Sequence, residues 1–231
     1  MERDVVPEIE RMNERSLHAA LKALYCRDGC SCEVDIENYI VDIIDADHTI
    51  IEIQTSCLSN IRKKITSLVQ NYRVKLVYPV AVEKTLYVYD EPQGALLYSR
   101  KSPKRGGIAD IFREALHLRD ILLHPNFELE VVFINAEELR AKDGKGSWRR
   151  GGTSIFDKQL TSVVEKLTLK TADDYRNILP ASLPSPFTNK DLSVALCMSV
   201  DQARRITYCL RSMGLLLHAG KKNRFLLYLR N

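Results

Sequence analysis

Carboxylate side chains stand in two apolar segments of the chain, ten positions apart. Asp42 lies in Tyr39–Asp45 (YIVDIID) and Glu52 in Thr49–Thr55 (TIIEIQT). Burying such groups is costly unless a cation or hydrogen bonds compensate. Two carboxylates close together are the hard oxygen ligands that Mg²⁺ or Mn²⁺ prefers. The pair predicts a metal site, in which the ion would polarise a phosphate and make an attacking water more acidic.

The elements that must position this pair can be read from the surrounding pattern. Helical spacing of apolar residues predicts one helix over residues 7–26 and another over 58–72. Between them, turn residues separate three extended segments, which we expect to form an antiparallel meander. The segments are Cys32–Ile36, Tyr39–Asp45 and Thr49–Thr55. Asp42 and Glu52 can then converge on neighbouring strands, and Glu14, on the apolar stripe of the first helix, faces the same sheet.

Plainer interpretations remain open for these acids. Asp42 would then be a turn or edge residue, Glu52 would lie on a solvent-facing side, and Glu14 would be a solvated helix residue. Asp35 is the alternative ligand if the strand register differs.

The order of these residues resembles the PD-(D/E)xK nuclease superfamily, over roughly residues 7–134. Members carry an acid on a first helix, an Asp on the next hairpin, a Glu-x-Lys on the following strand, and then a helix. Glu14, Asp42 and Glu52 match the three acids, whereas Gln54 replaces the lysine. The resemblance implies that these four residues are catalytic: Asp42 and Glu52 hold the metal and Gln54 positions the water.

Because Gln54 carries no charge, a cation would have to come from elsewhere. Arg62, Lys63, Lys64 and Lys75 are the nearby candidates. Some restriction endonucleases of the superfamily have a glutamine here, so activity is compatible with the change. The chain is also similar to a little-described group of prokaryotic proteins that join such a core to a C-terminal winged helix.

The rest of the chain divides by composition. We expect a nuclease-like core over 1–140, a Gly-rich basic linker over 141–152, and a helical and winged-helix region over 153–231. The predicted fold class is α/β, a restriction-endonuclease-like mixed sheet flanked by helices and followed by that C-terminal domain. The further predicted elements are a hairpin of Val74–Val82 with Thr85–Tyr89, a helix Ile108–His117, a strand Phe127–Ile134 and a helix Ile155–Leu167.

The C-terminal part is basic. From residue 185 onward, eight Lys and Arg oppose two Asp, a net of +6, and the remainder nets −2 because the whole chain carries +4. Helices Thr188–Cys197 and Val200–Met213, followed by a hairpin with a basic tip, are typical of a winged helix-turn-helix, which binds DNA or proteins. The candidate nucleic-acid contacts along the chain are Lys63, Lys64, Arg100, Lys101, Lys104, Arg105, Gln202, Arg205, Arg211, Lys221, Lys222 and Arg224.

Composition limits the other classes of protein. The chain has 231 residues, and it contains no apolar run long enough to span a membrane. Its N-terminus lacks the apolar stretch of a secretory signal, and its six cysteines fit reduced thiols, so we expect a cytoplasmic protein. Cys26, Cys30 and Cys32 have the spacing CxxxCxC, but a zinc site there lacks a second ligand pair, with Cys57 the nearby candidate.

Together these observations predict a metal-dependent nuclease that cleaves DNA, using Mg²⁺ or Mn²⁺, with RNA as a further substrate to test. The alternative is a non-catalytic DNA-binding regulator, or an assembly factor with an inactive nuclease-like fold. A homodimer is expected by analogy with other nucleases of this fold.

Overall fold

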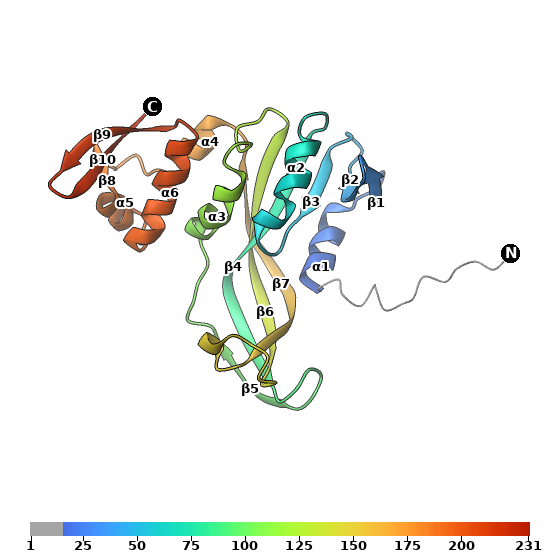
Figure 1. Cartoon of the computed structure of the whole chain (residues 1–231). Coiled ribbons are helices and arrows are strands. Elements are labelled where there is room, and N and C mark those ends of the chain that lie inside the picture. Colours follow the sequence, from blue (N-terminus) through green and yellow to red (C-terminus); the bar gives the residue numbers. More distant parts are fainter. Residues whose placement is uncertain (1–15) are drawn as a thin grey trace.

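A mixed sheet forms the centre of the structure, a computed structural model that describes residues 16–231 (Figure 1). Its strands are β1 (Ser31–Ile36), β2 (Tyr39–Ile44), β3 (Ile50–Ile53), β4 (Val74–Tyr89), β5 (Leu96–Lys101), β6 (Phe127–Ala141) and β7 (Ser154–Leu169). They lie in the order β1-β2-β3-β4-β6-β7, with β5 also paired to β4. The first three strands form the expected antiparallel meander, β3, β4 and β6 are parallel, and β7 is antiparallel to β6. The α/β class is confirmed.

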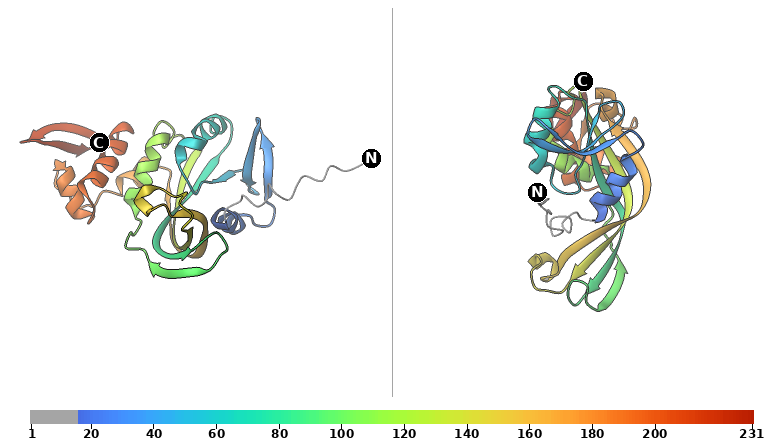
Figure 2. Two further views of the ribbon diagram at one scale, coloured as in Figure 1. Left: turned by 60° about the horizontal axis from the view of Figure 1, so that its bottom comes forward. Right: turned by 90° about the vertical axis from the view of Figure 1, so that its right-hand side faces the viewer.

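Helices cover both faces of this sheet (Figures 1 and 2). On one face, Leu17 and Leu21 of α1 (Ser16–Tyr25) pack on alternate apolar residues such as Ile43 and Ile51. The opposite face carries α2 (Arg62–Leu68), preceded by the 3₁₀ helix η2 (Leu58–Ile61), and α3 (Ile108–Ala115), followed by the 3₁₀ helix η3 (Leu116–Leu118). Strands β2 and β3 are therefore covered on both faces, apart from the exposed Ile40, whereas the edge strand β1 is largely exposed.

One end of the sheet projects from the helical body (Figure 2). This β-arm comprises β5 and the ends of β4, β6 and β7 that pair beside it, residues 83–101 and 135–163. The predicted hairpin of Val74–Val82 with Thr85–Tyr89 is wrong, because both segments belong to the single strand β4. A register shift between Ala81 and Glu83 interrupts the alternation there while β4 continues along β6.

The predicted helix Ile155–Leu167 is also wrong, since these residues lie within β7. Three register shifts in the β6–β7 ladder break the strict alternation that would reveal a strand. The Gly-rich segment 142–152, expected as a linker between two domains, instead connects β6 to β7 within one sheet, and it contains the 3₁₀ helix η4 (Trp148–Arg150). The sheet thus continues to residue 169, past the boundary expected at 141–152.

The C-terminal segment forms a smaller unit beside α3. It contains α4 (Ala172–Arg176), β8 (Phe187–Thr188), α5 (Asn189–Ala195), α6 (Val200–Ser212), β9 (Leu216–Lys222) and β10 (Phe225–Arg230). The three strands pair in the order β8-β10-β9, and α6 lies between α5 and α3 (Figure 1). Thr188 caps α5 as expected: its hydroxyl accepts the Asp191 amide at 3.3 Å. Among residues 16–231, no helix combines the length and hydropathy of a membrane span.

Candidate functional site

Asp42 and Glu52 meet where β2 and β3 separate. The paired residues Ile43 with Ile51 and Ile44 with Ile50 place Asp42 opposite Glu52, one step further along the same register. Each carboxylate there accepts a hydrogen bond from the other strand: Asp42 Oδ2 from the Ile53 amide at 2.8 Å, and Glu52 Oε1 from the Asp42 amide at 3.2 Å. These reciprocal bonds satisfy the backbone where the ladder opens, and they hold both side chains at one place.

Two side chains from helices on opposite faces complete this centre. Lys64 of α2 places its Nζ 2.5 Å from Glu52 Oε1 and also donates to the Ile40 carbonyl. His18 of α1 places Nε2 3.3 Å from Asp42 Oδ2. The site is sheltered, since the Glu52 side chain is 5% exposed and that of Asp42 is 21% exposed.

The surroundings shift the pKa values of these two carboxyl groups in opposite directions. Burial works to raise the pKa of Asp42, but the His18 and Ile53 hydrogen bonds and the nearby Lys64 charge outweigh it and hold that pKa below its usual value. For Glu52, burial and the adjacent Asp42 charge raise the pKa above its usual value despite Lys64. Asp42 is therefore the firmly ionised member, and Glu52 is the one that gains most from a further cation.

The donor set fits the hard divalent ion that the sequence implies. The hydrogen bonds made by the described residues use Asp42 Oδ2 and Glu52 Oε1, which leaves the second oxygen of each carboxylate for an ion. Carboxylate oxygens are suitable ligands for Mg²⁺ or Mn²⁺. The repulsion that raises the pKa of Glu52 is one that such an ion would relieve.

The other two expected catalytic residues are placed differently. The Gln54 amide donates to the Ser56–Cys57 turn, from Nε2 to the Cys57 carbonyl at 3.4 Å, and its Oε1 accepts from Ser56 at 3.3 Å. Its described contacts do not include Asp42 or Glu52. Glu14 lies outside the described residues.

A cavity of about 180 Å³ lies where the β-arm joins the body. Leu17 and Thr55 line it, each close in sequence to a residue of the centre, although Asp42 and Glu52 themselves do not. Its charged lining comprises Lys84, Lys104, Arg113, Lys158, Asp110, Glu137 and Glu138. Glu138 is buried, and Lys84 and Arg140 pair with it at 3.4 and 2.5 Å. Glycine at 106 permits the basic loop to reach this cavity, because a Cβ there would lie 2.5 Å from the Ala81 carbonyl oxygen.

The expected nucleic-acid contacts fall into three groups. Lys63 is exposed on α2, whereas its neighbour Lys64 is committed to Glu52. Arg100 and Lys101 lie on the edge strand β5, and Lys104 and Arg105 in the loop after it, where Arg105 pairs with Glu83 at 2.9 Å. The third group lies on the C-terminal unit: Gln202, Arg205 and Arg211 on α6, and Lys221, Lys222 and Arg224 on the β9–β10 hairpin.

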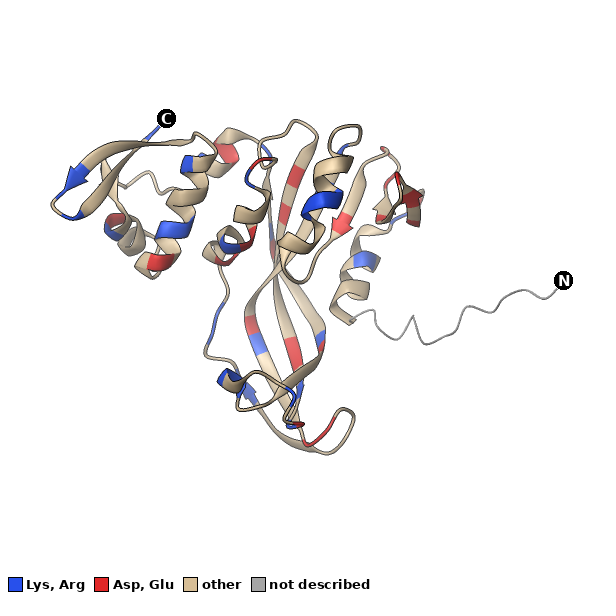
Figure 3. Ribbon diagram, viewed as in Figure 1, with Lys and Arg blue, Asp and Glu red and all other residues tan. Residues whose placement is uncertain are grey.

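Gln202 has a local structural role within that third group. Its Oε1 accepts hydrogen bonds from the amide and hydroxyl of Ser199, at 3.0 and 3.1 Å, as part of the capping box at the start of α6. The exposed side chains on this helix include Arg204, Tyr208 and Arg211, spaced at i, i+4 and i+7 along one face, and Asp201, which pairs with Arg204 at 2.7 Å. Figure 3 shows the basic residues of α6 and of the hairpin tip on this unit.

Sequence reasoning did not assign His18 and Lys64 to the centre. His18 lies four positions after Glu14, on the helix expected to face the sheet, and this spacing was the available signal. Lys64 was one of four candidate cations, and the rotation of α2, set by the buried Ile65 and Leu68, selects it.

The fold and the site define a mixed α/β protein with paired carboxylates at the junction of two strands. The chain belongs to the family described as Domain of unknown function (DUF8091), which matches residues 15–170 and so includes Asp42, Glu52 and Lys64. It is 31% identical over 226 residues to an uncharacterised protein of Treponema pallidum (strain Nichols), covering 95% of this chain and 86% of that protein. No solved structure matches the chain.

Proposed function

We propose that this protein is a metal-dependent nuclease that binds DNA and hydrolyses its phosphodiester bonds at the Asp42–Glu52 centre. The observation that carries the proposal is the convergence of the two sheltered carboxylates with Lys64, on β2, β3 and the helix that follows. The order of helix, hairpin, strand and helix agrees with the PD-(D/E)xK arrangement that the sequence resembles. The mixed sheet flanked by helices is compatible with the same interpretation.

In this proposal each residue has one task. Asp42 and Glu52 would hold Mg²⁺ or Mn²⁺, which supplies charge neutralisation at the phosphate and a more acidic water. Lys64 provides the positive charge that the superfamily lysine provides elsewhere, and His18 orients Asp42. Of the cations that line the neighbouring cavity, Lys84 and Arg113 pair with Glu138 and Glu114, which leaves Lys104 as the candidate contact for a phosphate backbone. Gln54 has an indirect role, because its side chain donates a hydrogen bond to the Cys57 carbonyl and so holds the turn after β3.

Cleavage of supercoiled plasmid and labelled duplex, single-stranded DNA and RNA with Mg²⁺ or Mn²⁺ tests this function. We expect the wild type to cut at least one of these substrates, and Asp42→Asn and Glu52→Gln to lose at least about a hundredfold in rate. Asp35→Asn is the matched control, since Asp35 is an exposed acid in the same meander and should leave the rate unchanged. Calorimetric titration with Mn²⁺ adds a readout independent of turnover, with weaker binding expected for Asp42→Asn.

The rival function is DNA binding without cleavage, as a regulator or assembly factor. Two observations favour it: Gln54 is turned toward Cys57, and Lys64 already forms an ion pair with Glu52. Salt-dependent DNA binding by a wild type that cuts none of the four substrates would select this rival. Equal cutting by wild type and Asp42→Asn would place catalysis elsewhere. Sedimentation velocity tests the expected homodimer.

A further inference from the structure

A second group of potential metal ligands lies outside the Asp42–Glu52 centre. The Cys57 thiol, a Glu114 carboxylate oxygen and a His117 ring nitrogen lie within 4.8 Å of one another. Among residues 16–231, no other group of three or more His, Cys, Asp or Glu residues has its ligand atoms this close together. Cys26 and Cys32, whose sulfurs are 2.8 Å apart, do not form such a group with Cys30.

The chain builds this group from two elements that pack together. Glu114 and His117 stand three positions apart where α3 continues into η3, so both project from one side of the helix. Cys57 comes from the turn after β3 and directly precedes η2. Residues distant in sequence are thus brought to one point by the contact of the η2 and η3 turns.

Glu114 is held in position by its surroundings. It is 7% exposed; its Oε2 accepts the Leu58 amide at 3.2 Å, and its Oε1 accepts Arg113 Nε at 3.0 Å. Such partners orient a ligand in the way that an outer coordination shell does, and each oxygen keeps a lone pair for a metal. The exposed Arg113 pairs with this carboxylate, and His117 is also exposed, so one side of the group is open to solvent.

The chemical types of these three ligand atoms indicate which metal ion the group suits. One thiol, one imidazole and one carboxylate form a mixed soft and hard set suited to Zn²⁺ rather than to Mg²⁺ or Mn²⁺. Bonds of about 2.0–2.3 Å put tetrahedral ligand atoms roughly 3.5 Å apart, so the observed spread closes with small side-chain rotations. Thiolate and carboxylate carry two negative charges, the second of them paired with Arg113, and water can take the fourth position from the open side.

We propose that Cys57, Glu114 and His117 bind one Zn²⁺ ion. The ion ties the segment that follows β3 to α3, and thereby fixes the turn to which Gln54 is bonded through the Cys57 carbonyl. The site shares no ligand with the Asp42–Glu52 centre. It therefore stands whether or not the chain is a nuclease.

Cobalt substitution tests the site, because Co²⁺ bound to a thiolate gives a charge-transfer band. The protein carries Cys26→Ser and Cys32→Ser throughout, since that neighbouring thiol pair would otherwise compete for the ion. We expect one Co²⁺ per chain with this band, displaced by Zn²⁺. Cys57→Ser removes the band, and His117→Gln weakens binding at least about tenfold.

The exposed Cys197 supplies the matched control, because Cys197→Ser removes a thiol remote from the group and should leave the band unchanged. His117 is exposed, so its substitution leaves the fold intact and any loss of affinity reports on the ligand. Absence of the band in the parent protein, or a band that survives Cys57→Ser, would overturn the proposal. Circular dichroism of each variant confirms that the comparison is made between folded chains.

Discussion

At the scale of single residues, the Glu52–Lys64 ion pair is largely shielded from solvent. The side chains are 5% and 18% exposed, and the pKa of Glu52 is raised by burial and by Asp42. Removing one member of such a pair leaves the other charge without compensation. Lys64 therefore stabilises the fold as well as the charge distribution of the centre.

This argument predicts the stability of Lys64→Met in the absence of divalent metal. We expect the free energy of unfolding to fall by about 2 kcal/mol, because the Glu52 carboxylate loses its cation while methionine keeps the packing. Urea titration followed by circular dichroism measures it. Lys63→Met changes the exposed neighbour on the same helix and should stay within about 0.5 kcal/mol of the wild type.

A double-mutant cycle separates the pair from other effects of the substitution. Glu52→Gln combined with Lys64→Met should recover part of the loss, since neither buried charge then remains. If Lys64→Met proves no more destabilising than Lys63→Met, the pair carries no such energy and the assignment of Lys64 to the centre fails.

At the scale of elements, a second buried charge cluster joins α1 to three strands. Glu130 of β6, whose side chain is 9% exposed, accepts the Tyr25 hydroxyl, and Lys75 and Lys166 each approach it to 3.4 Å. Burial works to raise the pKa of Glu130, but the Tyr25 hydrogen bond and both lysine charges outweigh it and keep that pKa below its usual value. The cluster thus links α1, β4, β6 and β7 through one carboxylate.

The direction of this shift predicts an acid sensitivity. Because the pKa of Glu130 is lower in the folded chain than in the unfolded chain, the unfolded state takes up the proton first as pH falls. The stabilisation is complete above the unfolded pKa of about 4.5 and is lost as pH falls through the lower folded value. Glu130→Gln should be less stable at neutral pH and should lose less stability on acidification.

Urea unfolding at a series of pH values between about 7 and 3 measures this difference. Glu165→Gln, an exposed glutamate on β7, is the matched control and should follow the wild-type profile. A Glu130→Gln profile parallel to that of the wild type would refute the role of this carboxylate.

The same scale explains which elements the sequence could predict. The meander could be predicted because its turn residues are local in sequence, and short turns between neighbouring strands place Asp42 near Glu52. The strand β7 could not be predicted, because register shifts in its pairing with β6 interrupt the two-residue alternation of a strand. One such shift lies between Phe133 and Ile134 of β6. The group of Cys57, Glu114 and His117 was equally hidden, because its members meet only through tertiary packing.

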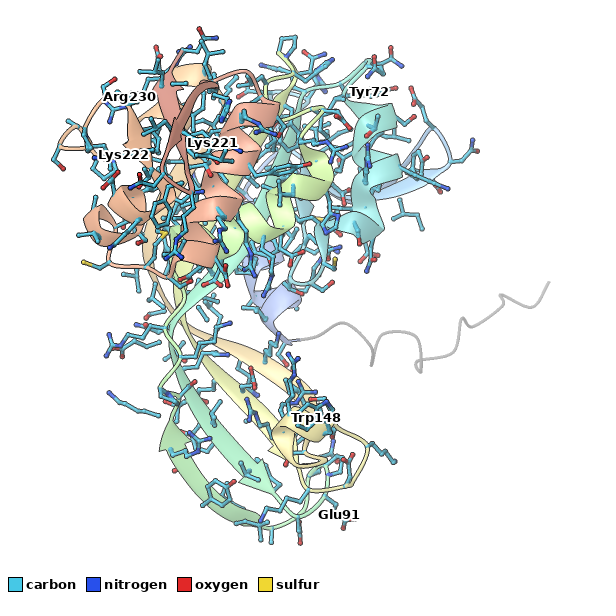
Figure 4. The ribbon with its side chains drawn as sticks, turned by 60° about the vertical axis from the view of Figure 1, so that its left-hand side comes forward. Tyr72, Glu91, Trp148, Lys221, Lys222 and Arg230 are labelled. Atoms are coloured by element: carbon cyan, nitrogen blue, oxygen red, sulfur yellow. The ribbon has the colours of Figure 1, made fainter. Side chains whose placement is uncertain are left out.

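At the scale of the whole molecule, two of the clusters of basic residues lie on different parts of the structure. Lys221 and Lys222 lie on the β9–β10 hairpin, whereas Trp148 lies on the β-arm, with Arg149 beside it (Figure 4). The exposed side of α6 adds Arg211 to the first place. The two clusters therefore define two different candidate faces for the phosphate backbone, which substitutions on each of them can distinguish.

The winged helix expected from the sequence would place that face on α6 and the hairpin. Replacing Arg211, Lys221 and Lys222 together by alanine should weaken duplex binding at every sequence, because these residues would contact phosphates. The slope of log K against log salt should fall by about 2 to 3, since each lost phosphate contact contributes about 0.9. Fluorescence anisotropy at several salt concentrations measures both quantities, with Asp42→Asn included to show that binding survives loss of the centre.

A matched control variant removes the same number of positive charges from the β-arm. Lys142, Lys145 and Arg149 are exposed near its end, and their joint replacement by alanine takes away three positive charges without touching the C-terminal unit. If this second variant keeps the wild-type slope while the first loses it, phosphate contacts are concentrated on the C-terminal unit. The opposite result would move the duplex to the β-arm, because counterion release follows the charges that contact phosphates rather than the net charge of the chain.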